Sequence, residues 1–294
     1  MSYRYSPRVF DREPEIVAET LYVVGGLYGN VEALRAVERL AARERGPVRI
    51  VFNGDFHWFD VLATDFSAIE EGVAAHTVLR GNVETEIASD DSGAGCGCAY
   101  PLDVSDAVVS CSNEILERLR ETVRAFSATR DRLARLPMHL VARVGDARVG
   151  IVHGDATSLA GWGFDSDRLA DPAHRRWVES MFAQARVDVF ASTHTCLPAL
   201  ARFDGGVVAN NGAAGMPNFA SERSGLLTRI GIRPIDSPVA WEERIGNTHV
   251  QIVPIAYDHE RWLVRFLSAW PEGSPAHASY YSRIVDGPGQ SASA

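Results

Sequence analysis

The sequence predicts an α/β fold in which two packed sheets are flanked by helices within one domain. The first half of the chain alternates short buried strands with amphipathic helices, the pattern of parallel strands joined by helical crossovers. The second half is richer in strands, and no internal repeat or linker separates it from the first. The length of 294 residues suits one large domain of this kind.

The elements of the first half follow from the spacing of apolar residues. Strands are expected at residues 20–25, 48–52 and 77–80, each a short apolar run that ends in glycine or asparagine. Residues 30–44 form a helix because their apolar side chains recur three and four positions apart. A second helix is expected at residues 67–75. The strands therefore pair in parallel across helical connections.

The second half reads mainly as strands. They are expected at residues 140–144, 149–153, 187–192, 207–209, 226–232 and 249–255. Residues 167–186 form the one clear helix of this half, and residues 233–246 are expected to be an insertion loop.

Residues 90–136 are expected to be an insertion in the domain. Residues 90–106 have the composition of a long loop, and residues 113–136 follow as a long helix. The final residues, GPGQSASA, are typical of a disordered tail. The chain then divides into an N-terminal extension (1–18), the domain (19–286) and the tail (287–294).

The composition is that of a soluble globular protein, with 46% hydrophobic and 23% charged residues. No apolar run approaches the ~18–20 residues of a membrane helix. The N-terminal segment carries charges throughout and has no hydrophobic core, so no signal peptide is visible. A cytoplasmic location is the expectation.

The charge balance bears on the partners. The chain carries 29 basic and 38 acidic residues, a formal net charge of −9. No run of lysine or arginine offers the basic face that a nucleic acid polymer or an anionic membrane needs. Small phosphorylated ligands remain compatible with an acidic chain if a metal ion supplies positive charge locally.

Four polar residues follow four separate predicted strands: Asp55, Asn82, His153 and His194. Taken singly, such an aspartate is usually a turn or helix cap, and such a histidine is usually structural. Each lies beside a glycine or another small residue, however, and ligands of α/β sheets gather beyond the carboxyl ends of the strands. Together they predict a metal site of mixed oxygen and nitrogen ligands, which suits Mn, Fe, Zn or Ni.

Short motifs surround these residues in a fixed order. They are Gly26-Leu27-Tyr28-Gly29-Asn30, Gly54-Asp55, Gly81-Asn82-Val83-Glu84, His153-Gly154, Thr193-His194-Thr195-Cys196-Leu197-Pro198 and Asn210-Asn211-Gly212-Ala213. The order resembles that of the calcineurin-like metallophosphoesterases, particularly their small prokaryotic phosphodiesterase branch, over about residues 20–257. The resemblance implies a four-layer α-β-β-α sandwich with two mixed sheets, and a metal-dependent phosphoesterase.

The departures from the family pattern concern one of its two metals. That metal takes an aspartate and two histidines, at positions that are Gly26, Tyr28 and Cys196 in this chain. The other metal takes an aspartate, an asparagine and two histidines, and the resemblance places these on the four residues named above. It therefore implies one divalent transition metal (Mn, Fe, Zn or Ni) per chain, which binds a phosphate oxygen as a Lewis acid.

Acid–base groups are less clearly marked. The histidine that donates a proton in the family is replaced by Val83. Glu84 or His57 are candidates to take over its role, although His57 is equally a loop residue. Tyr28 either donates a hydrogen bond to phosphate or fills the volume of a lost ion. The aromatic residues around Trp58 either stack on a substrate or pack in the core.

The four cysteines leave two interpretations open. Four cysteines do not make a disulfide framework, and a reducing compartment is the simpler assumption. Cys196 stands at a ligand position, and a loop carrying Cys96 and Cys98 over the pocket would rebuild a thiolate-rich second site. Otherwise Cys96 and Cys98 are small loop residues. A disulfide between them would close a very small ring and is not expected.

The sequence thus predicts a metal-dependent hydrolase of a small phosphodiester or phosphomonoester. The alternative is a catalytically impaired homologue that binds a phosphorylated ligand or a partner protein. The residues at positions 26, 28 and 83 favour this alternative, whereas the complete ligand set of one metal favours the enzyme. The sequence does not indicate an oligomeric state.

Overall fold

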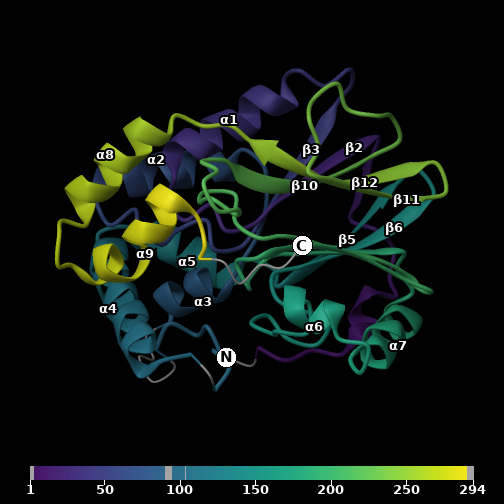
Figure 1. Cartoon of the computed structure of the whole chain (residues 1–294), viewed down its shortest axis with the longest axis horizontal. Helices are drawn as coiled ribbons and strands as arrows, with labels where there is room; N and C mark the ends of the chain where they lie inside the picture. Colours follow the sequence, from purple (N-terminus) through teal and green to yellow (C-terminus); the bar gives the residue numbers. More distant parts are fainter. Residues whose placement is uncertain (1–2, 90–94, 103, 290–294) are drawn as a thin grey trace.

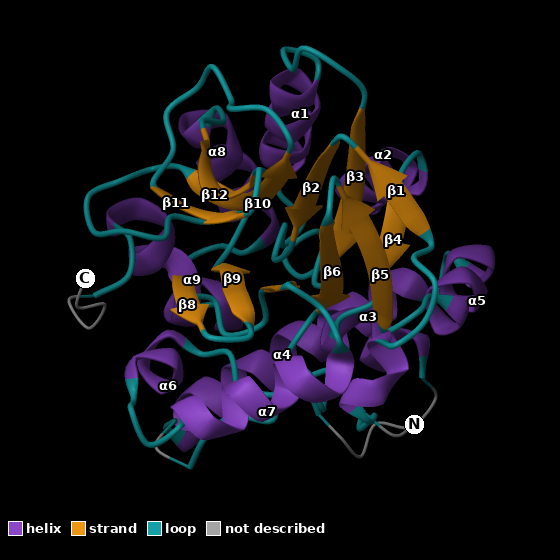
Figure 2. Cartoon of the chain, turned by 90° about the vertical axis from the view of Figure 1, so that its right-hand side faces the viewer, coloured by secondary structure: helices purple, strands orange, loops and turns teal. Residues whose placement is uncertain are grey.

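The structure, a computed structural model, describes residues 3–89, 95–102 and 104–289. Two six-stranded mixed sheets pack face to face, with helices on their outer faces (Figure 1, Figure 2). The predicted α/β sandwich is confirmed. Among the described residues, no helix combines the length and the apolar character needed to cross a membrane.

Each sheet contains a block of parallel strands. One sheet has the order β1 (Ile16–Ala18), β5 (His139–Val144), β6 (Ala147–Val152), β7 (Val189–Ser192), β9 (Gly206–Asn211) and β8 (Pro198–Phe203). The other has the order β11 (Trp241–Ile245), β12 (Thr248–Ile255), β10 (Gly225–Gly231), β2 (Thr20–Val24), β3 (Val48–Asn53) and β4 (Thr77–Leu79). Strands β2, β3 and β4 pair in parallel, as do β6, β7 and β9.

Strand β2 shows how the layers are held together. Its side chains alternate between the two faces of the sheet, and all five residues are buried. Leu21 and Val23 belong to the cluster between the sheets, with residues of β6 and β7 such as Ile151. Tyr22 and Val24 face the other way, into the cluster that includes the first helices. Burial on both faces explains the continuous apolar run of this strand.

The helices fall into three groups. Covering the β2 sheet are α1 (Val31–Ala41), α2 (Ala63–Ala74) and α8 (His259–Ala269). Beside the β6 sheet are α6 (Ser166–Ala170), α7 (Arg175–Ala185) and the 3-10 turn η1 (Pro7–Phe10). At one end of the sandwich, on the left of Figure 1, lie α3 (Asn82–Ala88), α4 (Asp106–Val123), α5 (Ser127–Arg135) and α9 (Pro275–Asp286).

Two predicted helices are each divided in the structure. The helix expected at residues 113–136 is α4 followed by α5, with a break near Phe126, whose ring packs on Phe66 at 4.9 Å between centroids. The helix expected at residues 167–186 is α6 followed by α7. Helix α6 ends at Ala170, and Asp171 is its C-cap residue. Because Asp171 precedes Pro172, helical backbone geometry is unfavourable there, so the helix stops.

Several strands and helices of the structure were not predicted from the sequence. The segment 233–246 was expected to be an insertion loop, but it contains β11, which pairs antiparallel with β12. Strands β1 and β8 and helices α3, α8 and α9 were not predicted either. Residues 90–94 and 103 of the predicted loop, and 290–294 of the predicted tail, lie outside the described residues.

Candidate metal centre

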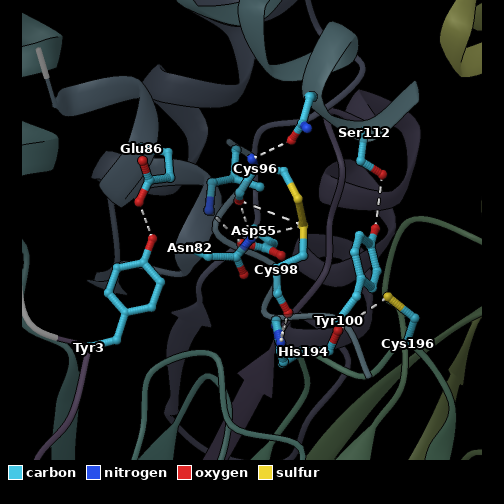
Figure 3. The surroundings of a disulfide bond; sticks show 12 residues. Tyr3, Asp55, Asn82, Glu86, Cys96, Cys98, Tyr100, Ser112, His194 and Cys196 are labelled. Atoms are coloured by element: carbon cyan, nitrogen blue, oxygen red, sulfur yellow. Dashed lines mark hydrogen bonds between the residues drawn. A yellow bond between two sulfur atoms is a disulfide. The ribbon is translucent and has the colours of Figure 1, made fainter. Parts of the chain in front are cut away.

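The structure brings four predicted ligands together at the strand ends. His153 directly follows β6, and its Nε2 lies 3.3 Å from Asp55 Oδ2, 3.2 Å from Asn82 Oδ1 and 3.2 Å from His194 Nδ1. One ligand atom each from Asp55, His153 and His194 lie within 4.8 Å of one another. All four residues are buried. Figure 3 shows Asp55, Asn82 and His194 converging on this centre.

Hydrogen bonds to the backbone orient the two imidazoles. His153 Nδ1 lies 2.8 Å from the Asn53 carbonyl oxygen, and His194 Nε2 lies 3.1 Å from the Cys98 carbonyl oxygen. A carbonyl only accepts, so these contacts assign the protons to His153 Nδ1 and His194 Nε2. The remaining nitrogen of each ring then points its lone pair into the centre.

The centre therefore collects acceptors without donors. The Asn82 amide donates through Nδ2 to the Cys96 carbonyl oxygen at 3.0 Å, which leaves its Oδ1 facing His153. Two oxygens and two nitrogens face one another in a buried space, an arrangement that is unfavourable without a cation. A proton on His153 would be shared with only one of the neighbouring acceptors, whereas a metal ion would bind all four acceptor atoms. The donor set fits a divalent transition metal.

The electrostatics favour the ligand forms of Asp55 and His194. Burial raises the pKa of Asp55, but the two histidines beside it lower the pKa more, to below its usual range. Burial and the neighbouring His153 lower the pKa of His194 to about 3. Burial also lowers the pKa of His153, but the Asp55 carboxylate raises it above the usual value. An ionised aspartate and a neutral His194 are the states that bind metals.

Backbone strain is concentrated around this centre. Among the described residues, seven non-glycine residues have positive φ, and four of them belong to the strand-end motifs: Tyr28 (55°), Asp55 (52°), His194 (39°) and Cys196 (63°). Such conformations cost of order 1–3 kcal/mol each and tend to occur at functional sites. Gly81 is needed for a related reason, because a Cβ there would collide with the Asp55 carboxylate.

At the positions that the resemblance assigns to a second metal, Tyr28 contacts both Gly26 and Cys196. The Tyr28 ring is buried beside Gly26, where an added Cβ would lie 2.9 Å from the ring. The Tyr28 hydroxyl lies 2.8 Å from Cys196 Sγ. Cys196 is not among the residues whose ligand atoms converge, because its thiol pairs with Tyr28 instead. Burial, with the neighbouring Cys196 and Asp55, holds the Tyr28 pKa well above its usual range.

The expectation that Cys96 and Cys98 remain unpaired is wrong, because the structure joins them in a disulfide. Gly95 and Gly97 both have positive φ, and this turn brings the two Cα atoms to 5.4 Å, within the usual range for a disulfide. Cys96 and Cys98 lie beside the site, as the thiolate interpretation required, but paired in a disulfide they offer no thiolates. Their carbonyl groups instead hold Asn82 and His194 in place (Figure 3).

The Glu84 side chain accepts hydrogen bonds from the backbone around the site. Its carboxylate accepts hydrogen bonds from the amides of Asp55 and Gly81, both at 2.8 Å, and of Phe56 and His57, at 3.0 and 3.2 Å. Burial and the Asp55 charge raise the pKa of Glu84 to about 7, against the effect of these donors. Glu84 does not line the cavity beside the metal centre. It positions the loop that carries Asp55.

His57, the other acid–base candidate, is also held inside the fold. Its Nδ1 lies 2.6 Å from Asp60 Oδ2 and its Nε2 lies 2.8 Å from Glu70 Oε1. Burial lowers the pKa of His57, but the two carboxylates raise it to about 10. With both nitrogens occupied and the ring fully buried, His57 has no free nitrogen for a substrate.

Sequence reasoning missed part of the wall beside the centre. A cavity of about 270 Å³ is lined by Asp55, Asn82 and His194, and also by Tyr280 and Arg283 of α9. Helix α9 follows the last motif in the sequence, so no motif pointed to it. The aromatic residues Phe56, Trp58 and Phe59 all belong to the core, and Trp58 also lines the cavity.

Comparison with solved structures gives the class of fold. The chain superposes on a metallophosphoesterase from Sphaerobacter thermophilus with a TM-score of 0.59 and 14% identity, over 92% of this chain and 100% of that one. It also superposes on a hypothetical protein from Pyrococcus horikoshii OT3 with a TM-score of 0.62 and 19% identity, over 93% and 99% of the two chains. No protein-family model and no curated protein matches the sequence. The fold is that of the calcineurin-like metallophosphoesterases.

Proposed function

We propose that the chain is a phosphoesterase that uses one divalent transition metal, held by Asp55, Asn82, His153 and His194. The observation that carries the proposal is the convergence of four buried acceptor atoms whose orientations are fixed by other hydrogen bonds, that of Asp55 by the Val83 amide, which donates to its Oδ1 at 3.2 Å. Two imidazoles, a carboxylate and an amide oxygen suit Mn, Fe, Zn or Ni. The metallophosphoesterase fold supports the reaction class.

A divalent metal at this centre would supply a Lewis acid that polarises a phosphoryl oxygen and makes water a better nucleophile. The chain's own residues then position the ester. Tyr28 lines the cavity, and its raised pKa keeps the phenol protonated, so it can donate a hydrogen bond to a phosphoryl oxygen. The acidic chain favours a small phosphate ester over a nucleic acid polymer or a membrane surface.

The second candidate is a protein that binds a phosphate ester without turnover. The observation in its favour is that neither Glu84 nor His57 reaches the cavity, while Val83 lines it. A leaving group would therefore receive no proton from either candidate acid. An ester whose leaving group is already a weak base needs no such proton, which makes an activated ester the right first substrate.

A paired assay separates the two functions. Purified protein is loaded with Mn or Zn and assayed on a nitrophenyl phosphodiester, alongside the variants His153→Ala and Asp55→Asn. An enzyme hydrolyses the ester only with metal and loses activity in both variants, while a control variant, His76→Ala, keeps it. Metal-dependent thermal stabilisation by phosphate without product indicates the binding protein. Equal hydrolysis by wild type and the two ligand variants contradicts the proposal.

A further inference from the structure

The cavity beside the metal centre has two kinds of wall. One wall is the centre itself, with Asp55, Asn82 and His194. A second wall comes from Cys98, Tyr100, Val104 and, at the start of α4, Val108, and from Tyr280 and Arg283 of α9. Helices α4 and α9 pack against each other, so the two segments form one structure. Neither segment contains a strand-end motif, so this wall is a feature of the chain separate from the metal site.

Aromatic rings line both walls of the cavity. Trp58, Tyr100, Trp162 and Tyr280 all line the cavity. The Tyr100 and Trp162 ring centroids are 6.3 Å apart, and Trp162 lies 5.5 Å from the His194 ring. These side chains are positioned before any ligand arrives. The Tyr100 hydroxyl bonds the Ser112 hydroxyl at 2.9 Å, as Figure 3 shows, and the Trp162 indole donates to the Cys98 carbonyl oxygen at 3.1 Å.

One cation faces this space. Arg283 of α9 lines the cavity and donates through Nη2 to the Cys196 carbonyl oxygen at 2.6 Å. Its Nε is buried and has no hydrogen-bond partner among the described residues, and no described carboxylate forms an ion pair with it. The indole N–H of Trp58 is also buried without a described partner. A buried donor left unpaired is costly, so both side chains would gain from an acceptor close to them.

We propose that this cavity is a subsite for a ring-bearing phosphoryl group, with Arg283 binding a phosphoryl oxygen and the aromatic rings of the walls holding a flat aryl or nucleoside ring. The proposal rests on the function proposed above and specifies its substrate class. Flat rings gain most from edge-to-face and stacked contacts with fixed aromatic rings. A single arginine beside the metal matches one phosphoryl group, whereas a polyphosphate chain would need further cations. The volume of about 270 Å³ suits one small ester.

Binding of two phosphonates tests the subsite without turnover. Phenylphosphonate and methylphosphonate carry the same phosphoryl head on a carbon–phosphorus bond that hydrolysis does not cleave. Titration calorimetry on the metal-loaded protein is expected to give phenylphosphonate an affinity about tenfold higher. Tyr100→Leu removes a ring but keeps apolar volume, and should reduce that preference to about threefold or less without weakening methylphosphonate binding.

A substitution of Arg283 tests whether it binds the phosphoryl group. Arg283→Gln should weaken both phosphonates by about tenfold or more, because both present the same oxygens. The matched control is Arg261→Gln, whose side chain is exposed on α8 and pairs with Glu32 instead. It should leave both affinities unchanged. If Arg283→Gln unfolds, Val108→Asp replaces it: Val108 lines the rim, is 39% exposed, and an aspartate there should repel both phosphonates.

The outcomes distinguish the two proposals. Equal affinities for the two phosphonates, or a preference unchanged by Tyr100→Leu, overturn the subsite. Normal methylphosphonate binding in Arg283→Gln overturns the role of the cation, and normal binding in Val108→Asp overturns the placement of the phosphoryl group in this cavity. In these cases metal-dependent hydrolysis of the nitrophenyl diester would still support the proposed function. A protein that binds neither metal nor phosphonate contradicts both.

Discussion

The two sides of the site differ in how their polar atoms are satisfied. On one side, Asp55, Asn82, His153 and His194 point acceptors at one another, each oriented by a contact elsewhere. On the other, the Tyr28 hydroxyl and the Cys196 thiol satisfy each other beside Gly26. Both sides lie at strand ends and include residues with positive φ, Asp55 and His194 on the first side and Tyr28 and Cys196 on the second. The comparison teaches that a metal site is recognised by acceptors without donors rather than by strain or by strand position alone.

Removing a ligand residue of the first side should have the largest effect on metal binding. His153→Ala deletes the nitrogen at the middle of the cluster, so the variant should lose metal binding altogether. In wild type, metal at a hundredfold excess over its dissociation constant should add about 2.7 kcal/mol to the free energy of unfolding. Denaturant titration with and without metal measures this increment. An unchanged increment in the variant would contradict the assignment of the ligands.

Introducing metal ligands at positions 26, 28 and 196 tests why the second side holds no metal in this account. Gly26→Asp alone should destabilise the fold by about 1–3 kcal/mol, because the new side chain meets the Tyr28 ring at a positive φ. The triple variant Gly26→Asp, Tyr28→His, Cys196→His removes the ring and supplies three ligands. We expect it to bind a second ion, counted by elemental analysis. A triple variant that folds but still binds one ion would mean that more than these side chains excludes the second metal.

The disulfide loop should have an intermediate effect. Its two carbonyls orient Asn82 and His194, and loss of such outer contacts typically reduces metal affinity by about 10–100-fold. Cys96→Ser, and reduction of wild type by a dithiol, should both weaken metal binding in a competition titration with a chelator. Cys111→Ser is the control, since that thiol is free and belongs to α4. Equal affinity in all of these proteins would show that the ligands need no support from the loop.

The smallest effect is expected from Tyr28→Phe. The variant removes the hydroxyl but leaves the ring that fills the space, so it should cost about 1 kcal/mol, the value of one hydrogen bond. The number of metal ions per chain should not change. Thermal unfolding and elemental analysis measure the two quantities together. Loss of metal from this variant would imply that Tyr28 belongs to the metal centre.

The centre was predictable because its signals are local. Asp55, Asn82 and His194 each stand within three residues of a strand end beside small residues, and such turns are visible in the sequence. The lone-pair geometry that distinguishes ligands from caps was not visible, because it depends on the carbonyl groups of Asn53, Cys96 and Cys98. The contacts that hold His57 inside the fold were not visible in the sequence either, because its partner Glu70 lies on α2.

The second wall of the cavity was not predictable because its contacts are long-range. Arg283 donates to a carbonyl 87 residues earlier in the chain, and no motif connects them. Helices α8 and α9 were missed although Trp262, Phe266 and Ala269 recur at helical spacing on α8. The disulfide was rejected on ring size, whereas the glycines on either side of Cys96 allow the turn. Residues that gather at strand ends can thus be predicted from sequence more readily than a cavity wall that depends on long-range contacts.

Metal stoichiometry tests the central claim most directly. Protein incubated with Mn, Zn, Fe or Ni, freed of excess ion and analysed for elements should hold one ion per chain, and His153→Ala should hold none. Two ions in wild type would contradict the account of the filled side at Tyr28 and Cys196. No ion with any of these metals would contradict the metal centre itself.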